Sequence, residues 1–179
     1  MNHIERRVIA VAAIGLTLGL TLGLNSVAEA RTPLPPAGED GVVFMNDENP
    51  AMAKAFARAR RELDQFLKLA AAPAAHQRDF AVKVGLVVGE ETEYVWINEI
   101  KPKPGGKFVG VINNEVELTD KFKLGDSHTF AKSEIVDWTY IDTRERRMHG
   151  NYTLCALLTQ EPADQAEEYR RKFKLDCQL

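Results

Sequence analysis

Acidic side chains in and beside the predicted strands are the residues of this chain best suited to catalysis. Hydrolysis of a glycosidic bond needs two carboxyl groups about 5 to 10 Å apart across a cleft. The sequence spacing selects no pair, so a polymer hydrolase is kept as the alternative function and no catalytic residue is assigned. The acids concerned are Glu93, Glu99, Asp126, Glu134 and Asp137.

Histidine and serine spacing indicates neither a metal site nor a catalytic triad. His76, His128 and His149 lie outside the three- to four-residue steps that are typical of metal ligands. Ser127 precedes His128, but adjacency alone does not make a triad, and the sequence has no Gly-x-Ser-x-Gly elbow. We therefore expect no metal and no cofactor.

Two tryptophans and one aspartate are the candidate contact residues for a ligand or partner. Asp137 and Trp138 are neighbours in a predicted strand, so their side chains point to opposite faces. One interpretation puts Trp138 in the core and lets Asp137 bind the backbone N–H groups of a turn, and the other puts Asp137 in a groove. Trp96 is either a core anchor or an exposed stacking platform.

Cys155 and Cys177 are the two cysteines of the chain. A bridge between them would close a loop of about twenty residues and contribute roughly 3 kcal/mol in the chain-entropy model. A strand followed by a straight helix would overshoot Cys155, so the sequence leaves a disulfide and two free thiols both open.

The first thirty residues predict a secretory signal peptide. Arg6 and Arg7 precede the uncharged apolar run of residues 8–24, and Ala28-Glu29-Ala30 supplies the small-x-small pattern that signal peptidase cleaves. We expect cleavage after Ala30 and a periplasmic or secreted protein. The alternative is an uncleaved segment that anchors the protein in the membrane.

Composition bounds the remainder of the chain. Residues 31–46 are rich in Pro, Gly and charge and predict a flexible lead, and residues 47–179 are long enough for one domain. The formal net charge of −3 gives no reason to expect nucleic acid as a partner. The basic cluster Arg144, Arg146 and Arg147 on a predicted hairpin tip is either simply solvated or a docking point for an acidic partner.

Hydrophobic periodicity predicts helices at both ends of this domain and strands between them. Asn49 and Pro50 open the first helix and Pro73 stops it, while Glu161-Pro162 opens the last. Gly110 inside the third strand predicts a bulge or a close approach. Short loops imply antiparallel pairing, so we expect an α+β fold, a bent antiparallel sheet of about six strands flanked by an N-terminal and a C-terminal amphipathic helix. The predicted strands cover residues 80–88, 93–100, 107–112, 128–131, 135–141 and 152–158.

A series of short segments resembles one family over residues 47–175. The segments are Met52 to Phe66 with its Ala-Arg pair, 80–84 (FAVKV), 93–97 (EYVWI), 108–113 (FVGVIN), Gly125-Asp126, 135–138 (IVDW) and 150–153 (GNYT). In this order they resemble the YegJ-like family of bacterial domains of unknown function. The chain departs from that pattern at Tyr94, Asn114 and Leu154, where the family often has histidine, proline and a basic residue.

The resemblance implies a fold and, often, export, but it brings no activity. Together with the signal peptide it favours a small non-catalytic binding or interaction module in the cell envelope, of an inhibitor or immunity-like kind. Trp96, Asp137 and Trp138 would be its contact residues, and its partner is an unknown envelope protein or ligand. The alternative becomes a hydrolase of envelope polymers.

Overall fold

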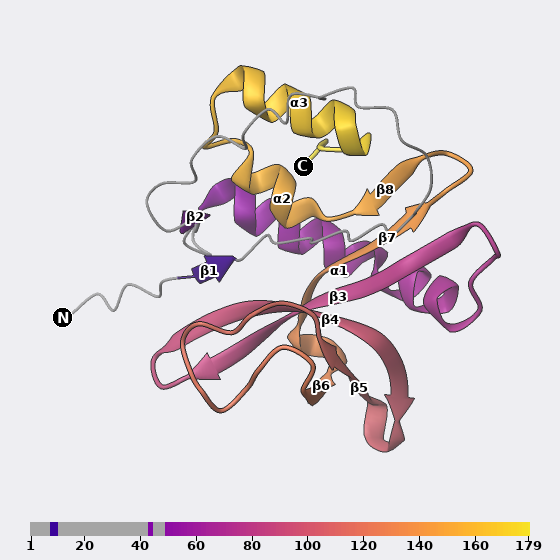
Figure 1. Ribbon diagram of the computed structural model, residues 1–179, viewed down its shortest axis with the longest axis vertical. Helices are drawn as coiled ribbons and strands as arrows, with labels where there is room; N and C mark the ends of the chain where they lie inside the picture. The colour runs from indigo at the N-terminus through magenta and orange to yellow at the C-terminus, as the bar shows by residue number, and fades with distance from the viewer. Residues whose placement is uncertain (1–7, 11–42, 45–48) are drawn as a thin grey trace, which may run out of the picture.

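The computed structural model describes residues 8–10, 43–44 and 49–179 of the chain. Six antiparallel strands form an open sheet, and helices cover one side of it (Figure 1). This confirms the predicted α+β class. The strands are β3 (Gln77–Val88), β4 (Glu91–Lys103), β5 (Lys107–Ile112), β6 (Ser127–Ala131), β7 (Ile135–Asp142) and β8 (Arg147–Gly150).

The sheet is bent because its long strands are interrupted by bulges, which increase the local twist. Strand β3 lies between β4 and β7, and its register against β7 shifts twice, once between Arg78 and Ala81. The pairing of β4 with β5 shifts between Asn98 and Lys101. Gly110 marks a close approach there, because a Cβ at this position would meet the carbonyl oxygen of Asn98 at 2.4 Å.

Helix α1 (Pro50–Ala71) supplies six buried residues of the core. The Asn49 side chain caps it by accepting a hydrogen bond from the Ala51 N–H at 2.8 Å, and Pro50 occupies the first turn, where no backbone donor is needed. Its apolar stripe packs against β7 and the centre of the sheet. The indole Nε1 of Trp138 donates to the carbonyl of Ala59 at 3.1 Å, which fixes α1 against β7.

The prediction of a strand over residues 152–158 is wrong, because helix α2 (Tyr152–Leu157) lies there. The last strand, β8 (Arg147–Gly150), comes earlier and begins at Arg147 of the predicted hairpin tip. Gly150 and Asn151 both adopt left-handed backbone conformations, with φ of 72° and 56°, and so turn the chain out of the sheet. Alternating hydrophobicity could not distinguish this short buried helix from a strand.

Helix α3 (Ala163–Phe173) lies outermost, beyond α2 in Figure 1. Its contact with the rest of the protein is narrower than predicted, since Ala166 is its one buried residue and Ala163 is exposed. Lys174 adopts a left-handed conformation that ends the helix and turns the chain back. Cys177 reaches Cys155 in this way, and the two form a disulfide with a Cα–Cα distance of 5.2 Å.

Two short strands precede the domain in the described part of the chain. Strand β1 (Val8–Ala10) pairs in parallel with β4 and antiparallel with β2 (Val43–Phe44). Strand β1 falls inside the predicted signal peptide, and the remainder of that segment and most of the predicted lead lie outside the described residues. None of the described helices is long and apolar enough to cross a membrane.

Candidate functional site

A cavity of about 280 Å³ opens between α1, the β7–β8 hairpin and the C-terminal tail. Aromatic rings and charged side chains meet in its wall, which is the combination typical of ligand sites. The aromatic rings are those of Phe66, Trp138, Tyr140 and Tyr152, and the charged or titratable groups are Arg58, Glu62, Arg147, His149 and Asp176.

The aromatic part of the wall is a continuous stack anchored in the core. Phe66 on α1 stacks on Trp138 with ring centroids 5.0 Å apart, and Tyr152 meets the same indole edge-on at 5.5 Å. Tyr140 stacks on His149 at 4.6 Å, with the two planes 4° apart. Each ring is fixed by its neighbour, so this surface is rigid and preformed.

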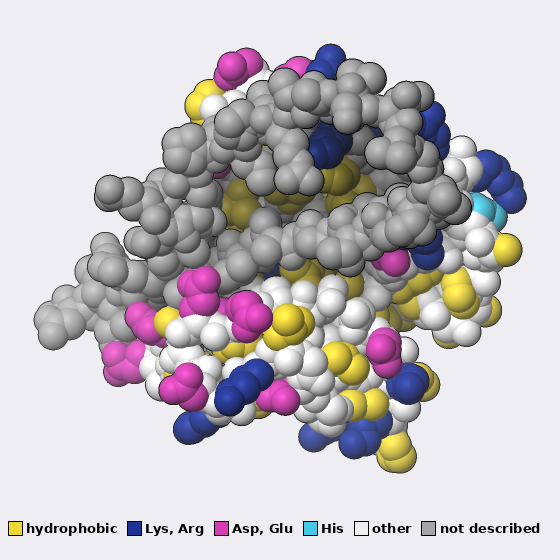
Figure 2. Space-filling view, viewed as in Figure 1, with side chains coloured by type: hydrophobic (Ala, Val, Ile, Leu, Met, Phe, Trp, Pro, Cys, Tyr) yellow, Lys and Arg dark blue, Asp and Glu magenta, His cyan; other side chains and the backbone are white. Residues whose placement is uncertain are grey.

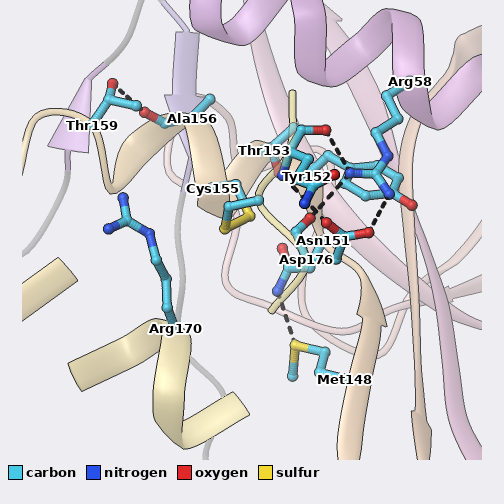
Figure 3. The surroundings of a disulfide bond; sticks show 12 residues. Arg58, Met148, Asn151, Tyr152, Thr153, Cys155, Ala156, Thr159, Arg170 and Asp176 are labelled. Carbon is cyan, nitrogen blue, oxygen red and sulfur yellow. Dashed lines mark hydrogen bonds and ion pairs between the residues drawn. A yellow bond between two sulfur atoms is a disulfide. The ribbon is translucent and has the colours of Figure 1, made fainter. Parts of the chain in front are cut away.

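Arg58 ties the C-terminal tail to α1 beside the cavity. Its guanidinium donates to the Asp176 carboxylate at 2.6 Å, to the Gln178 carbonyl at 2.7 Å and to Glu62 at 3.1 Å. It also lies over the Tyr152 ring, 4.3 Å from the centroid. Figure 3 shows Arg58, Tyr152 and Asp176 together, close to the disulfide that holds the same tail. The ion pair with Arg58 holds the pKa of Asp176 below its ordinary value.

The Tyr152 hydroxyl donates a hydrogen bond to the Glu62 carboxylate across the cavity. Burial, and then this hydrogen bond, raise the pKa of Tyr152 above its ordinary range. The phenol therefore stays neutral and acts as a fixed donor rather than as a base.

Arg147 is the cation of this wall that is left available. Its guanidinium makes no hydrogen bond or ion pair with any described residue, and its Nε is buried. Arg58, by contrast, is saturated with acceptors. An anionic group entering the cavity would therefore find its counter-charge at Arg147.

Lys83, Asp137 and Thr153 form a buried polar cluster next to this region. The Lys83 ammonium donates to the Thr153 hydroxyl at 2.7 Å, and that hydroxyl donates to the Asp137 carboxylate at 2.7 Å. Asp137 also accepts from the backbone N–H groups of Trp138, Tyr152 and Thr153. The carboxylate thus caps α2 and joins it to the sheet.

Burial sets the electrostatics of this cluster. It lowers the pKa of Lys83 to about 8, an effect that the nearby Asp137 carboxylate partly offsets. It raises the pKa of Asp137, against the attraction of Lys83 and the donors of Thr153 and Trp138. Lys83 is 4 % exposed and Asp137 is 0 % exposed, so the cluster stabilises the fold and does not meet a ligand in this conformation.

The three predicted contact residues do not form one exposed surface. Trp138 is buried but lines the cavity. Trp96 is half-buried on β4, where the Lys83 ammonium lies 4.6 Å from its ring centroid. Lys83 is paired with Trp96 on one side and with Asp137 on the other. Trp96 and Asp137 therefore flank one lysine, away from the cavity.

Four of the five acids considered for hydrolysis, Glu93, Asp126, Glu134 and Asp137, accept hydrogen bonds from backbone N–H groups, and Glu99 lies beside a separate shallow cavity. Glu93, fully buried, accepts from the N–H groups of Glu117 and Leu118, with distances of 2.9 to 3.1 Å. Asp126 accepts from the N–H of Lys123 at 2.8 Å. These carboxylates therefore hold the backbone of neighbouring loops in place.

Sequence reasoning missed Lys83 and Arg58. A lysine in the middle of an alternating apolar strand, inside the FAVKV segment, was the available signal for a buried cation. Nothing in the sequence singled out Arg58, because it is one of several charged residues on the polar side of its helix. Its importance comes from the returning tail, which no local pattern predicts.

Comparison with known proteins assigns the chain to a family. An Escherichia coli (strain K12) protein named "Uncharacterized protein YegJ" is 32% identical over 137 residues, which cover 75% of this chain and 84% of that protein. No solved structure matches. The model of the family described as "Uncharacterized protein conserved in bacteria (DUF2314)" matches residues 49–177. The resemblance inferred from the sequence is thereby confirmed, and the chain belongs to this bacterial family of YegJ-like domains.

Proposed function

We propose that this protein is an exported, non-catalytic binding module of the bacterial cell envelope. Its ligand or partner inserts an anionic group and an adjoining apolar or planar group into the cavity between α1 and the β7–β8 hairpin. The observation that carries the proposal is the unpaired Arg147 guanidinium beside a rigid aromatic wall.

The chemistry of the surrounding groups favours binding over catalysis. Tyr152 is held neutral, and Arg58 and Asp176 are bound to each other. Asp137 is fully buried under α2 and cannot reach a substrate. A wall of fixed donors, acceptors and rings discriminates among ligands without transferring a proton.

Export is the second component of the proposal and rests on the N-terminal sequence. The basic residues, the apolar run and the exit after Ala30 agree with a secretory signal. The disulfide between Cys155 and Cys177 supports it, since such bonds persist in oxidising compartments.

Site-specific photocrosslinking in cells tests the binding component. A crosslinking amino acid at Gln65, an exposed residue that lines the cavity, is expected to capture a discrete adduct. The matched control places it at Val87, which is 74 % exposed on the β3–β4 hairpin. Equal adducts at both positions, or none at Gln65, would contradict the proposal. Cell fractionation and intact mass test export, with periplasmic protein that begins at Arg31 as the expected result.

A further inference from the structure

We propose that the β7–β8 hairpin binds a divalent transition-metal ion, such as Zn²⁺, through Asp142, Glu145 and His149. The inference does not rest on export or on a ligand in the cavity, although His149 also lines that cavity. Each of the three residues offers one ligand atom, and these atoms all lie within 4.8 Å of one another.

The hairpin itself brings these residues together. Asp142 ends β7, Glu145 lies in the turn, and His149 returns on β8, where it pairs with Tyr140. Ligand atoms in a tetrahedral zinc site lie about 3.5 Å apart, given metal–ligand distances of about 2.0–2.2 Å. The cluster therefore needs a contraction of about 1 Å, and the Glu145 side chain, 54% exposed, has the freedom to make it.

His149 presents a nitrogen without a hydrogen bond to this cluster. Its Nε2 is buried and makes no hydrogen bond to any described residue. Glu145 Oε2 lies 3.2 Å from that nitrogen, but the two are not aligned as donor and acceptor. The stack on Tyr140 holds the ring in this orientation. A lone pair and a carboxylate that converge without bonding each other are the arrangement that a cation would complete.

Asp142 has one oxygen held by backbone donors, and its other oxygen, beside His76, accepts no hydrogen bond from a described residue. Its Oδ1 accepts from the N–H groups of Arg144 and Glu145 at 2.9 and 3.0 Å, which orients the carboxylate. Its Oδ2 lies 3.4 Å from His76 Nε2. Because Arg144 donates to His76 Nδ1, the proton of that imidazole is on Nε2 and points toward Asp142. His76 thus positions Asp142 and is not counted among the ligands.

The charges around the hairpin fit a dication. Two carboxylates and a neutral imidazole balance two positive charges, and an N,O ligand set suits Zn²⁺ or Mn²⁺ rather than Ca²⁺, which takes six to eight oxygens. Two of the neighbouring cations have other contacts, and the third, Arg147, lies opposite Asp142 in the hairpin register. Arg144 binds His76, Lys174 donates to the Glu145 carbonyl at 2.7 Å, and Arg147 lines the cavity.

Calorimetric titration of the chelator-treated full-length protein with ZnCl₂ tests the site. The wild type is expected to bind one Zn²⁺ per chain. Glu145→Gln and His149→Gln are each expected to weaken binding at least tenfold, since each removes a ligand. His128→Gln is the matched control, because His128 is partly buried on β6, outside the cluster.

Folding and the contrary outcomes are checked in the same series. Far-UV circular dichroism of each variant should match the wild type, and Glu145→Gln alters an exposed turn side chain that the fold does not need. The proposal is overturned if the wild type binds no Zn²⁺. It is equally overturned if the two cluster variants bind as the wild type does, or if His128→Gln weakens binding as much as they do.

Discussion

Asp137 is the single residue on which the junction of the sheet with α2 depends most. Its carboxylate collects four hydrogen bonds and faces the buried Lys83 ammonium through Thr153. A buried acceptor with this many partners contributes far more to the free energy of unfolding than an exposed one. Its removal leaves buried donors and a buried charge with neither a partner nor water.

We expect Asp137→Asn to lower the free energy of unfolding by about 3 kcal/mol or more, because the buried Lys83 charge loses its counter-ion. Urea denaturation measures the loss. Asp126→Asn is the matched control: Asp126 is exposed and holds one turn N–H, so its replacement should cost less than about 1 kcal/mol. An equal loss of unfolding free energy in the two variants would show that the buried cluster around Asp137 stabilises the fold no more than an exposed turn does.

Asp176 makes stability depend on pH in the acid range. Arg58 lowers the pKa of this carboxyl in the folded state, so the folded protein keeps the carboxylate where the unfolded chain takes up a proton. The ion pair therefore contributes fully above the unfolded pKa of about 4, and its contribution is lost as pH falls through the lower folded value. With Asp176 38% exposed, we expect no more than about 1 kcal/mol.

Thermal unfolding of the wild type and Asp176→Asn measures this dependence. The difference between their melting temperatures should be largest near neutral pH and should shrink toward zero in strong acid. Added salt should reduce it at neutral pH, since the pair is partly exposed. A difference that is constant from neutral pH to strong acid would exclude the ion pair as its source.

At the level of elements, the sequence predicts well wherever periodicity and caps agree. Asn49, Pro50 and Pro73 place both ends of α1 within two residues, and the period-two runs place β3 to β7. The failure comes at residues 147–157, where burial on all sides hides the helical period of α2. The carboxylate that caps α2 comes from a distant strand, so no local pattern contains it.

The candidate site is less predictable than the fold for the same reason. Trp138 and the cysteine pair could be found by residue type, but their partners come from elements far apart in sequence. The search for metal ligands by histidine spacing alone could not find the cluster on the β7–β8 hairpin. Asp142, Glu145 and His149 combine two carboxylates and an imidazole across a turn, and the strand that returns from this turn was predicted at residues 152–158 instead of 147–150.

Gly150 lies at the junction of β8 and α2, and we expect this position to tolerate no side chain. A Cβ there would lie 2.1 Å from the Trp138 carbonyl oxygen, and its φ of 72° already disfavours other residues. We expect Gly150→Ala to cost more than about 3 kcal/mol in urea denaturation, since backbone must move. Gly89→Ala is the control, because Gly89 has φ of 64° with nothing within 4 Å. The Gly89→Ala variant measures only the cost of placing alanine at a positive φ, about 1 kcal/mol.

At the scale of the whole molecule, α1, the sheet and α2 build a hydrophobic core within residues 49–179. The buried hydrophobic residues of this part extend from Met52 to Ala166, and the tail is fastened by the disulfide and by Arg58. Strand β1 contacts β4 and β2 over three residues. Figure 2 shows most of the acidic side chains of the lower part of the view at its left, with basic side chains both among them and at the lower right. The visible face is therefore mixed in charge, as expected for a net charge of −3.

Residues 31–179 produced alone should therefore fold as the full chain does. Loss of the three-residue strand β1 removes its pairing with residues 92–94 of β4 and leaves the core cluster of residues 52–157 in place, so we expect the melting temperature to fall by no more than a few degrees, equivalent to about 1 kcal/mol. Differential scanning calorimetry of both forms, under the same oxidising conditions, makes the comparison. A shortened protein without a cooperative transition would mean that the N-terminal segment belongs to the folded protein. Cleavage after Ala30 would then remove a structural element, and the export proposal would fail with it.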